Sequence, residues 1–113
     1  MFALLLLMAA GIKTIITSSS DKKLESVKKL SPLIQGINYK THSDVEAEVK
    51  RLTNERGATI IINNAGVSSI PSNVASVARK GSISIVGFLE GFEAEWNPNS
   101  IYLGLMGKCA RIQ

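Results

Sequence analysis

The sequence predicts an α/β fold built around a doubly wound parallel sheet. Apolar, β-branched runs alternate along the chain with segments whose apolar residues recur at helical spacing, which is the pattern of βαβ units. One run, Ala58 to Asn63 (ATIIIN), is continuously apolar, as strands buried on both faces of a parallel sheet are. The 113 residues, 45% of them hydrophobic and 19% charged, are enough for one domain with a single core.

The first ten residues, Met1 to Ala10 (MFALLLLMAA), have two interpretations. Their apolar length and small C-terminal residues fit a signal peptide, but the charged segment that begins such peptides is missing. The run is also shorter than the roughly 18 residues that a membrane span needs. We favour a buried helix, hydrophobic on every side and ended by Gly11 as its C-cap.

The next segment has the pattern of a strand followed by a helix. Lys13 to Thr17 (KTIIT) is predicted to be a short buried strand, and Ser20 or Asp21 is expected to cap the helix. Apolar residues at helical spacing carry this helix to Leu30, and Pro32 stops it.

A second strand and helix follow in the same order. Gly36 to Asn38 is predicted to form a brief strand, Ser43 or Asp44 to cap the next helix, and Gly57 to end it. The helix places its apolar residues on one face: Val45, Val49 and Leu52.

The second half of the chain continues the alternation. Turns are expected at Ala65-Gly66 and at Lys80-Gly81, because small residues and glycine punctuate the apolar segments there. The predicted elements are a helix from Pro71 to Ala78, a strand from Ser82 to Val86, a helix from Asn99 to Met106 and a terminal strand from Ala110 to Ile112.

Charge and cysteine content exclude several classes of function. The formal net charge is +4, but the basic residues are scattered among acidic ones and form no cluster of five or six of the kind that binds nucleic acid. One cysteine, Cys109, and one histidine, His42, cannot form an internal disulfide or complete a zinc site. We therefore expect a cytoplasmic chain with no nucleic-acid or membrane partner, a buried Cys109 and a surface His42.

Five segments stand in the order and spacing of a known family. They are AAGIKTIITSSSDKKLESVKKL, INYKT, VEAEVKRLTNERGATIIINNAG, RKGSISIVGFLEG and NPNSIYLGLMGKCARIQ. From about Phe2 to its end, the chain resembles the Rossmann-like nucleotide-binding domain of the medium-chain, zinc-type alcohol dehydrogenase and quinone oxidoreductase superfamily. The resemblance implies an oxidoreductase that transfers a hydride between a nicotinamide cofactor and a carbonyl, alcohol or alkene.

The chain departs from the family pattern at its start. Family members place a strand and a Gly-x-Gly-x-x-Gly turn before the first helix, and their catalytic domain, with the substrate pocket and any zinc ligands, lies mostly upstream. The resemblance therefore implies a single incomplete Rossmann-like domain over residues 1–113, truncated at both ends, without catalytic residues or metal ligands. Whether the chain is itself an enzyme stays open, and we expect weak or undetectable NADPH binding. Without the first strand, the second and fourth family strands either meet or leave two half-sheets.

The resemblance implies that the 2′-phosphate of NADP lies beside the serine-rich loop of residues 18–23. Family members that prefer NADP place a small residue and a lysine there, matched by Ser19 and Lys23, whereas an NAD site needs an acid that accepts from the ribose hydroxyl. Asp21 comes late for that role and suits a helix cap equally well. Tyr39 matches the family tyrosine that approaches the same phosphate. The plain alternative is an ordinary solvated first helical turn.

Further cofactor-binding residues are implied at the ends of two later strands. Asn63, Asn64 and Gly66 would line the cleft near the cofactor riboses. Gly87 and Phe88 would reach the nicotinamide carboxamide through their backbone. A plain turn between strand and helix accounts for the Asn and Gly residues equally well.

The Asn-Asn-Ala-Gly segment after a strand is also typical of short-chain dehydrogenases. That family needs a Tyr-x-x-x-Lys further along the chain, and neither Tyr39 nor Tyr102 is followed by such a lysine. We therefore favour the medium-chain interpretation, in which Trp96 is a packing residue.

Two functions stay open from the sequence. The chain is either the cofactor-binding segment of an NADP-dependent oxidoreductase or a non-catalytic remnant that pairs its exposed sheet edge with another chain. Family relatives commonly form dimers through the edge of this domain, so the resemblance implies a homo-oligomer formed near the strand at Ala110 to Ile112.

Overall fold

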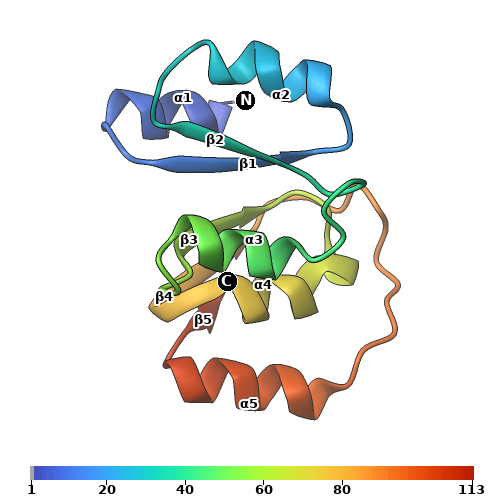
Figure 1. The fold of residues 1–113 in the computed structure, drawn as a ribbon. Helices are drawn as coiled ribbons and strands as arrows, with labels where there is room; N and C mark the ends of the chain where they lie inside the picture. Colours follow the sequence, from blue (N-terminus) through green and yellow to red (C-terminus); the bar gives the residue numbers. More distant parts are fainter. Residues whose placement is uncertain (1) are drawn as a thin grey trace. The chain divides into compact units, whose positions relative to one another are not determined.

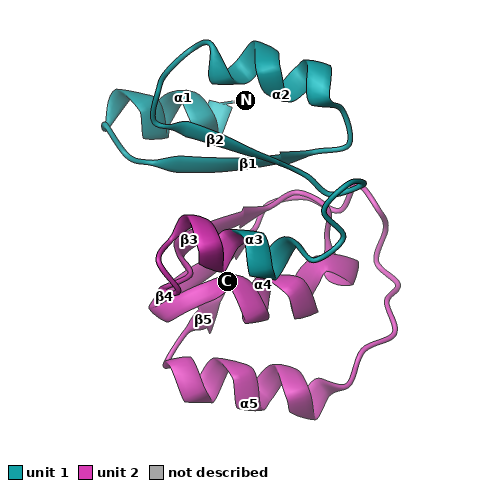
Figure 2. Ribbon diagram, in the orientation of Figure 1, with its two compact units in different colours: residues 1–48 teal, residues 49–113 magenta. Residues whose placement is uncertain are grey.

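A computed structural model describes residues 2–113 of the chain, so that Met1, the first residue of the predicted N-terminal helix, lies outside it. The chain divides into two compact units, residues 1–48 and residues 49–113, which are coloured separately in Figure 2. Each unit is described by itself.

The first unit is a two-stranded parallel sheet with helices before and between its strands (Figure 1). Strands β1 and β2 pair in register from Thr14 opposite Ile34 to Ser18 opposite Asn38. This confirms a βαβ unit, because parallel neighbours need a crossover, here a helix. The elements are α1 (Phe2–Ala9), β1 (Thr14–Ser18), α2 (Asp21–Lys28) and β2 (Ile34–Asn38).

Helix α1 confirms the predicted helix but not its predicted burial. The chain leaves the helix at Gly11, whose φ of 69° lies in the left-handed region that favours glycine at a helix end. Among the described helical residues only Leu4 is buried, whereas Phe2, Leu5 and Leu6 are 75%, 50% and 56% exposed. A sheet of two strands offers one narrow surface, so it covers one side of the helix and leaves the others in solvent.

Helices α2 and α3 differ from prediction only near their ends. Helix α2 ends at Lys28, before the predicted Leu30, which is 50% exposed. Helix α3 (Val45–Leu52) crosses the boundary between the units in sequence. Asp44 caps it, since its Oδ1 accepts a hydrogen bond from the Ala47 N–H at 3.1 Å.

The second unit is a three-stranded, all-parallel sheet in the order β3-β4-β5. Helices α4 and α5 connect successive strands, which again confirms the predicted alternation. Its elements are β3 (Ala58–Asn63), the short 3₁₀ helix η1 (Val67–Ser69), α4 (Ile70–Ser76), β4 (Val77–Ile85), α5 (Pro98–Lys108) and β5 (Arg111–Ile112).

Strand β4 begins earlier than the sequence predicts. The helix was expected to reach Ala78 and the strand to start at Ser82, but β4 starts at Val77, directly after α4. Val77 pairs with Ala58 and Ser82 pairs with Ile60. Four residues of β4 therefore lie opposite one residue of β3, which makes a bulge in β4. Lys80 and Gly81, with a φ of 60° at Lys80, therefore lie in the bulge within β4. They do not form a turn that precedes the strand.

The expectation that β3 is buried on both faces is wrong. Ile60 and Ile62 are 59% and 40% exposed, whereas Ile61 packs against the core of the unit. Successive residues of a strand point to opposite faces, and the core formed by α4, β4 and α5 lies on the face of Ile61. An apolar run thus marks the strand correctly but does not show that a second helical layer covers it.

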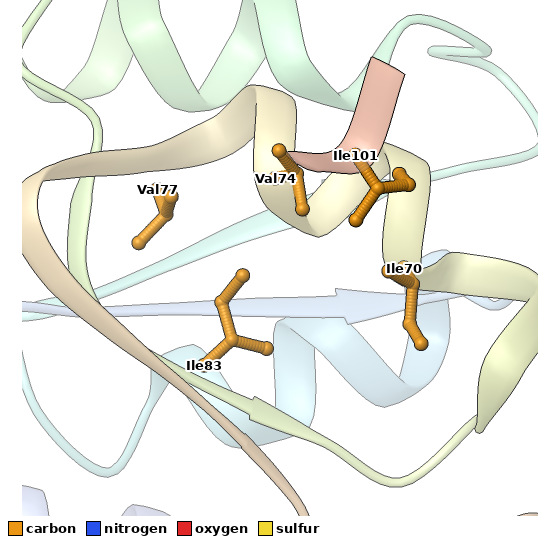
Figure 3. Close-up of a cluster of buried hydrophobic side chains, with 5 residues drawn as sticks. All are labelled: Ile70, Val74, Val77, Ile83 and Ile101. Carbon is orange, nitrogen blue, oxygen red and sulfur yellow. The ribbon is translucent and has the colours of Figure 1, made fainter. Parts of the chain in front are cut away.

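The core of the second unit joins α4, β4 and α5. Figure 3 shows its five buried members, Ile70, Val74, Val77, Ile83 and Ile101, of which Ile83 is 0% exposed. Trp96 packs against this cluster, and its indole N–H donates to the Val67 carbonyl at 3.2 Å, which confirms its role as a packing residue.

Helix α5 is capped at both ends, and Cys109 is its C-terminal cap. Asn97 caps the start of the helix, because its side chain accepts from the Asn99 N–H at 2.9 Å. At the other end Cys109 adopts a left-handed conformation with φ of 51° and is exposed. The expectation of a buried thiol is therefore wrong, since the residue lies at the point where the helix gives way to β5.

The strands form two half-sheets rather than one. Between residues 2 and 113, β1 pairs with β2 and β3 to β5 pair with one another, and no backbone pairing joins the two sets. In the same described range, no helix has the length and apolarity that crossing a membrane requires.

Shortening the buried isoleucine of β4 tests the core directly. We expect Ile83→Val to lower the free energy of unfolding by about 1 kcal/mol, because it removes a methylene from a fully buried site. Ile60→Val on the neighbouring strand is the control and is expected to change it by less than half as much, since Ile60 is 59% exposed. Urea unfolding followed by Trp96 fluorescence measures both; equal losses would contradict the assigned core.

Candidate functional site

The polar ends of β1 and β2 meet at one edge of the first unit. Both strands run in the same direction with Ser18 opposite Asn38, so their carboxyl ends lie together (Figure 1). The Tyr39 N–H donates to the Ser18 carbonyl at 3.2 Å and continues the ladder one residue beyond the strands. In doubly wound folds this edge is where ligands bind.

The start of α2 positions Lys23 beside this edge. The sequence left the cap open between Ser20 and Asp21; the structure assigns it to Ser20, whose hydroxyl oxygen accepts from the Lys23 N–H at 3.4 Å. Asp21 is the first helical residue. The positive end of the helix dipole therefore points toward the carboxyl edge of the sheet, which favours a negatively charged ligand.

Polar groups at this edge fall into two sets. One set is used internally: the Ser18 hydroxyl accepts from the Ser20 N–H at 3.2 Å, and the Asp21 carboxylate accepts from the Asn38 amide at 2.8 Å. The other set consists of the Ser19 hydroxyl, the Lys23 ammonium and the Tyr39 hydroxyl, which make no hydrogen bond or ion pair with any residue from 2 to 113.

The second set is suited to an anion. All three side chains are exposed, Tyr39 by 48%, and each can donate a hydrogen bond. The predicted residues Ser19, Lys23 and Tyr39 thus share one edge of the first unit, with their donors facing no internal partner. Asn38, which the sequence analysis did not single out, holds the frame around them; a polar residue ending an apolar strand was the available signal.

In the second unit, Asn63 builds the loop after β3. It is 4% exposed; its Oδ1 accepts from the Gly66 N–H at 2.9 Å and its Nδ2 donates to the Gly66 carbonyl at 3.0 Å. These two bonds close a tight turn, which is the plain structural role that the sequence left open. Asn64, by contrast, is exposed.

The loops after β3 and β4 bind each other. The N–H groups of Val86, Leu89 and Glu90 donate to the carbonyls of Asn63, Asn64 and Ala65 at 2.9, 3.1 and 2.9 Å. The Ser68 hydroxyl donates to the Glu90 carboxylate at 2.6 Å and adds a side-chain link between the same loops. Residues 63–66 and 86–90 therefore form one connected edge of the second unit.

The predicted residues of this edge lie close together. A Cβ atom on Gly66 would lie 3.2 Å from Phe88 Cα, and one on Gly87 would lie 3.2 Å from the Asn64 carbonyl oxygen. Phe88 stacks on Phe92 with 4.6 Å between ring centroids and is 45% exposed. The N–H groups of Gly87 and Phe88 make no hydrogen bond within the described chain, so they are available to a ligand.

A metal site needs several ligating side chains close together. Residues 2–113 contain no group of three or more His, Cys, Asp or Glu side chains placed to hold an ion. The described residues therefore do not form a zinc site by themselves.

Comparison with known proteins agrees with this geometry. The model of the family described as zinc-binding dehydrogenase matches residues 1–106. A zinc-type alcohol dehydrogenase-like protein of Schizosaccharomyces pombe is 35% identical over 112 residues, which is 99% of this chain and 32% of that protein. The chain thus spans about a third of the length of this relative.

Solved structures share the fold over nearly the whole chain. A quinone oxidoreductase of Pseudomonas syringae pv. tomato is 25% identical with a TM-score of 0.81, covering 98% of this chain and 33% of that one. The Escherichia coli quinone oxidoreductase, solved with NADPH, is 20% identical with a TM-score of 0.81, covering 98% and 32%. The fold is therefore Rossmann-like. The chain belongs to the zinc-binding dehydrogenase family.

Gly66 provides a test of the connected loop edge. Its φ of 114° is strained for other residues, and an added Cβ would lie 3.0 Å from the Gly91 carbonyl oxygen. We expect Gly66→Ala to destabilise the chain by about 1–3 kcal/mol in urea unfolding. Gly107→Ala in α5 is the control, because nothing lies within 4 Å of its added Cβ, and it is expected to be neutral or stabilising. A neutral Gly66→Ala would refute the described loop packing.

Proposed function

We propose that this chain is the NADP-binding part of a medium-chain oxidoreductase of the cytoplasm and that Ser19, Lys23 and Tyr39 bind the 2′-phosphate of the cofactor. The supporting observation is that these three exposed side chains share one edge of the first unit and have no internal partner, while their polar neighbours are hydrogen-bonded within the unit.

The chemistry of the three groups suits a phosphate ester. A 2′-phosphate carries up to two negative charges and three acceptor oxygens, so it is best met by an ammonium and hydroxyl donors. A 2′-hydroxyl, as in NAD, is best met by a carboxylate that accepts a hydrogen bond from it. The nearest carboxylate, Asp21, is already hydrogen-bonded to Asn38 at 2.8 Å, which favours the phosphate.

The second unit, taken by itself, carries backbone groups suited to a nicotinamide carboxamide. The free N–H groups of Gly87 and Phe88 can donate to the carboxamide oxygen, and Asn64 and Gly66 border the same edge. Asn63 would act through the loop that it closes. That the same fold holds NADPH in the Escherichia coli enzyme supports a nicotinamide cofactor as the ligand.

The proposed reaction is hydride transfer between the nicotinamide of the cofactor and a substrate that is a carbonyl, alcohol or alkene. Bound nicotinamide supplies or accepts the hydride, and the residues of this chain bind and orient it.

Binding of 2′,5′-ADP, which carries the 2′-phosphate without the nicotinamide, tests the proposal. We expect weak, roughly millimolar binding by the wild-type chain and about tenfold weaker binding by Lys23→Ala, because a charge-assisted hydrogen bond is lost. Amide chemical shifts of the ¹⁵N-labelled chain report both the affinity and the residues contacted. Lys29→Ala is the control, since it removes the same charge from the other end of α2.

Two results would count against this assignment. One is equal affinity of Lys23→Ala and the wild-type chain. The other is that the shifted amides lie away from Ser19, Lys23 and Tyr39.

A second candidate function is association of two copies through the second sheet. Strand β3 pairs with β4 on one side only, and no described strand pairs with its other side. Ile60 and Ile62 are exposed on the same strand, and Val86 just beyond β4 is 60% exposed. Exposed apolar edge strands favour pairing with another chain.

A lysine on this strand tests the association. We expect the wild-type chain to dimerise in sedimentation velocity and Ile60→Lys to shift it toward the monomer, because a charged edge residue opposes strand pairing. Leu89→Lys, at a loop position that is 87% exposed, is the control and is expected to leave the dimer intact. A wild-type chain that sediments as a monomer at every concentration would exclude this function.

A further inference from the structure

Asn38 is the most heavily used polar side chain near the candidate phosphate site. It is the last residue of β2 and only 7% exposed. Its Nδ2 donates to the Asp21 carboxylate at 2.8 Å, and its Oδ1 accepts from the Lys40 N–H at 3.0 Å. Its carbonyl accepts from the His42 N–H at 2.8 Å. One buried amide thus links the end of β2, the following turn and the start of α2.

The Asp21 carboxylate is the group whose placement matters. Asp21 stands between Ser19 and Lys23 in the chain and occupies the first turn of α2. Turned toward those residues, its negative charge would repel a phosphate and would accept a hydrogen bond from a ribose hydroxyl. In the structure it is turned toward β2, where the Asn38 amide satisfies one of its oxygens.

The link joins residues 17 positions apart, so no local preference of α2 imposes it. Asp21 is exposed and would otherwise sample several rotamers, some of them toward the ligand edge. Asn38 is buried and held by its other hydrogen bonds, so its Nδ2 is a fixed donor that selects one placement of the carboxylate.

We propose that Asn38 is a positioning residue that determines cofactor specificity. By holding the Asp21 carboxylate on the β2 side, it allows the edge formed by Ser19, Lys23 and Tyr39 to prefer a 2′-phosphate over a 2′-hydroxyl. This inference rests on the proposed function of the site.

The measured quantity is the ratio of affinities for 2′,5′-ADP and 5′-ADP, which differ at the 2′-position. We expect Asn38→Ala to lower this ratio about tenfold in the 113-residue chain, because the released carboxylate reaches the ligand edge. Adding Asp21→Asn to that variant is expected to restore most of the ratio, since the released group no longer carries charge. A merely structural loss at Asn38 would not be rescued by a change at Asp21.

Two further variants are controls for misfolding and for a general weakening of the turn after β2. Asp21→Asn alone is an exposed, mild change and is expected to leave the ratio within about twofold of the wild type, because the held carboxylate does not act on the ligand. Thr41→Ala removes another hydrogen bond to Asn38, the one from the Thr41 hydroxyl to the Asn38 carbonyl at 3.2 Å, without touching Asp21. It is expected to leave the ratio unchanged.

The outcomes separate this inference from the function on which it rests. A wild-type chain with no preference for 2′,5′-ADP would overturn both. A wild-type preference that survives Asn38→Ala, or that Asp21→Asn fails to rescue in the double variant, would overturn the role of Asn38 alone. A large rise of the ratio in Asp21→Asn by itself would also overturn it, because the carboxylate would then already act on the ligand.

Discussion

The candidate phosphate site depends on the parallel, in-register pairing of β1 with β2. Because Ser18 lies opposite Asn38, the polar residues that follow each strand leave the sheet at the same edge. The bond from the Tyr39 N–H to the Ser18 carbonyl extends this alignment beyond the strands. A shift of one residue would turn every side chain of a strand to the other face and separate these groups. The backbone ladder therefore brings Ser19, Lys23 and Tyr39 to a common place before any side chain contributes.

Side-chain hydrogen bonds then divide the polar groups into a frame and a binding surface. Ser18, Ser20, Asp21 and Asn38 satisfy one another or nearby backbone groups, so they hold the loops without facing a ligand. The second unit applies the same principle differently. Its loops after β3 and β4 are linked to each other through backbone groups, leaving only a few N–H groups free. Such internal satisfaction is what allows a site to hold its geometry without a ligand.

The order and type of the elements followed from sequence periodicity, while burial did not. The runs ending at Thr17 and Asn63 are strands because β-branched residues pack well on a pleated surface, whatever lies above them. Ile60, Ile62 and most of α1 are nevertheless exposed, because burial requires a second surface and an apolar run does not reveal whether one exists. The early start of β4 at Val77 was also hidden, since pairing with Ala58 outweighs the turn signal at Lys80-Gly81.

Sequence alone was sufficient to identify the family, the alternation of strands and helices, and the residue types suited to a phosphate, because these depend on local pattern and side-chain chemistry. Tertiary structure decided which of those residues are free to bind. Asp21 and Lys23 lie two positions apart in the same helical turn. The Lys23 ammonium nevertheless has no partner among the described residues, whereas the Asp21 carboxylate is hydrogen-bonded to Asn38, 17 residues away. A hydrogen bond between distant positions arises only when the strands pair, so no local pattern could have predicted it.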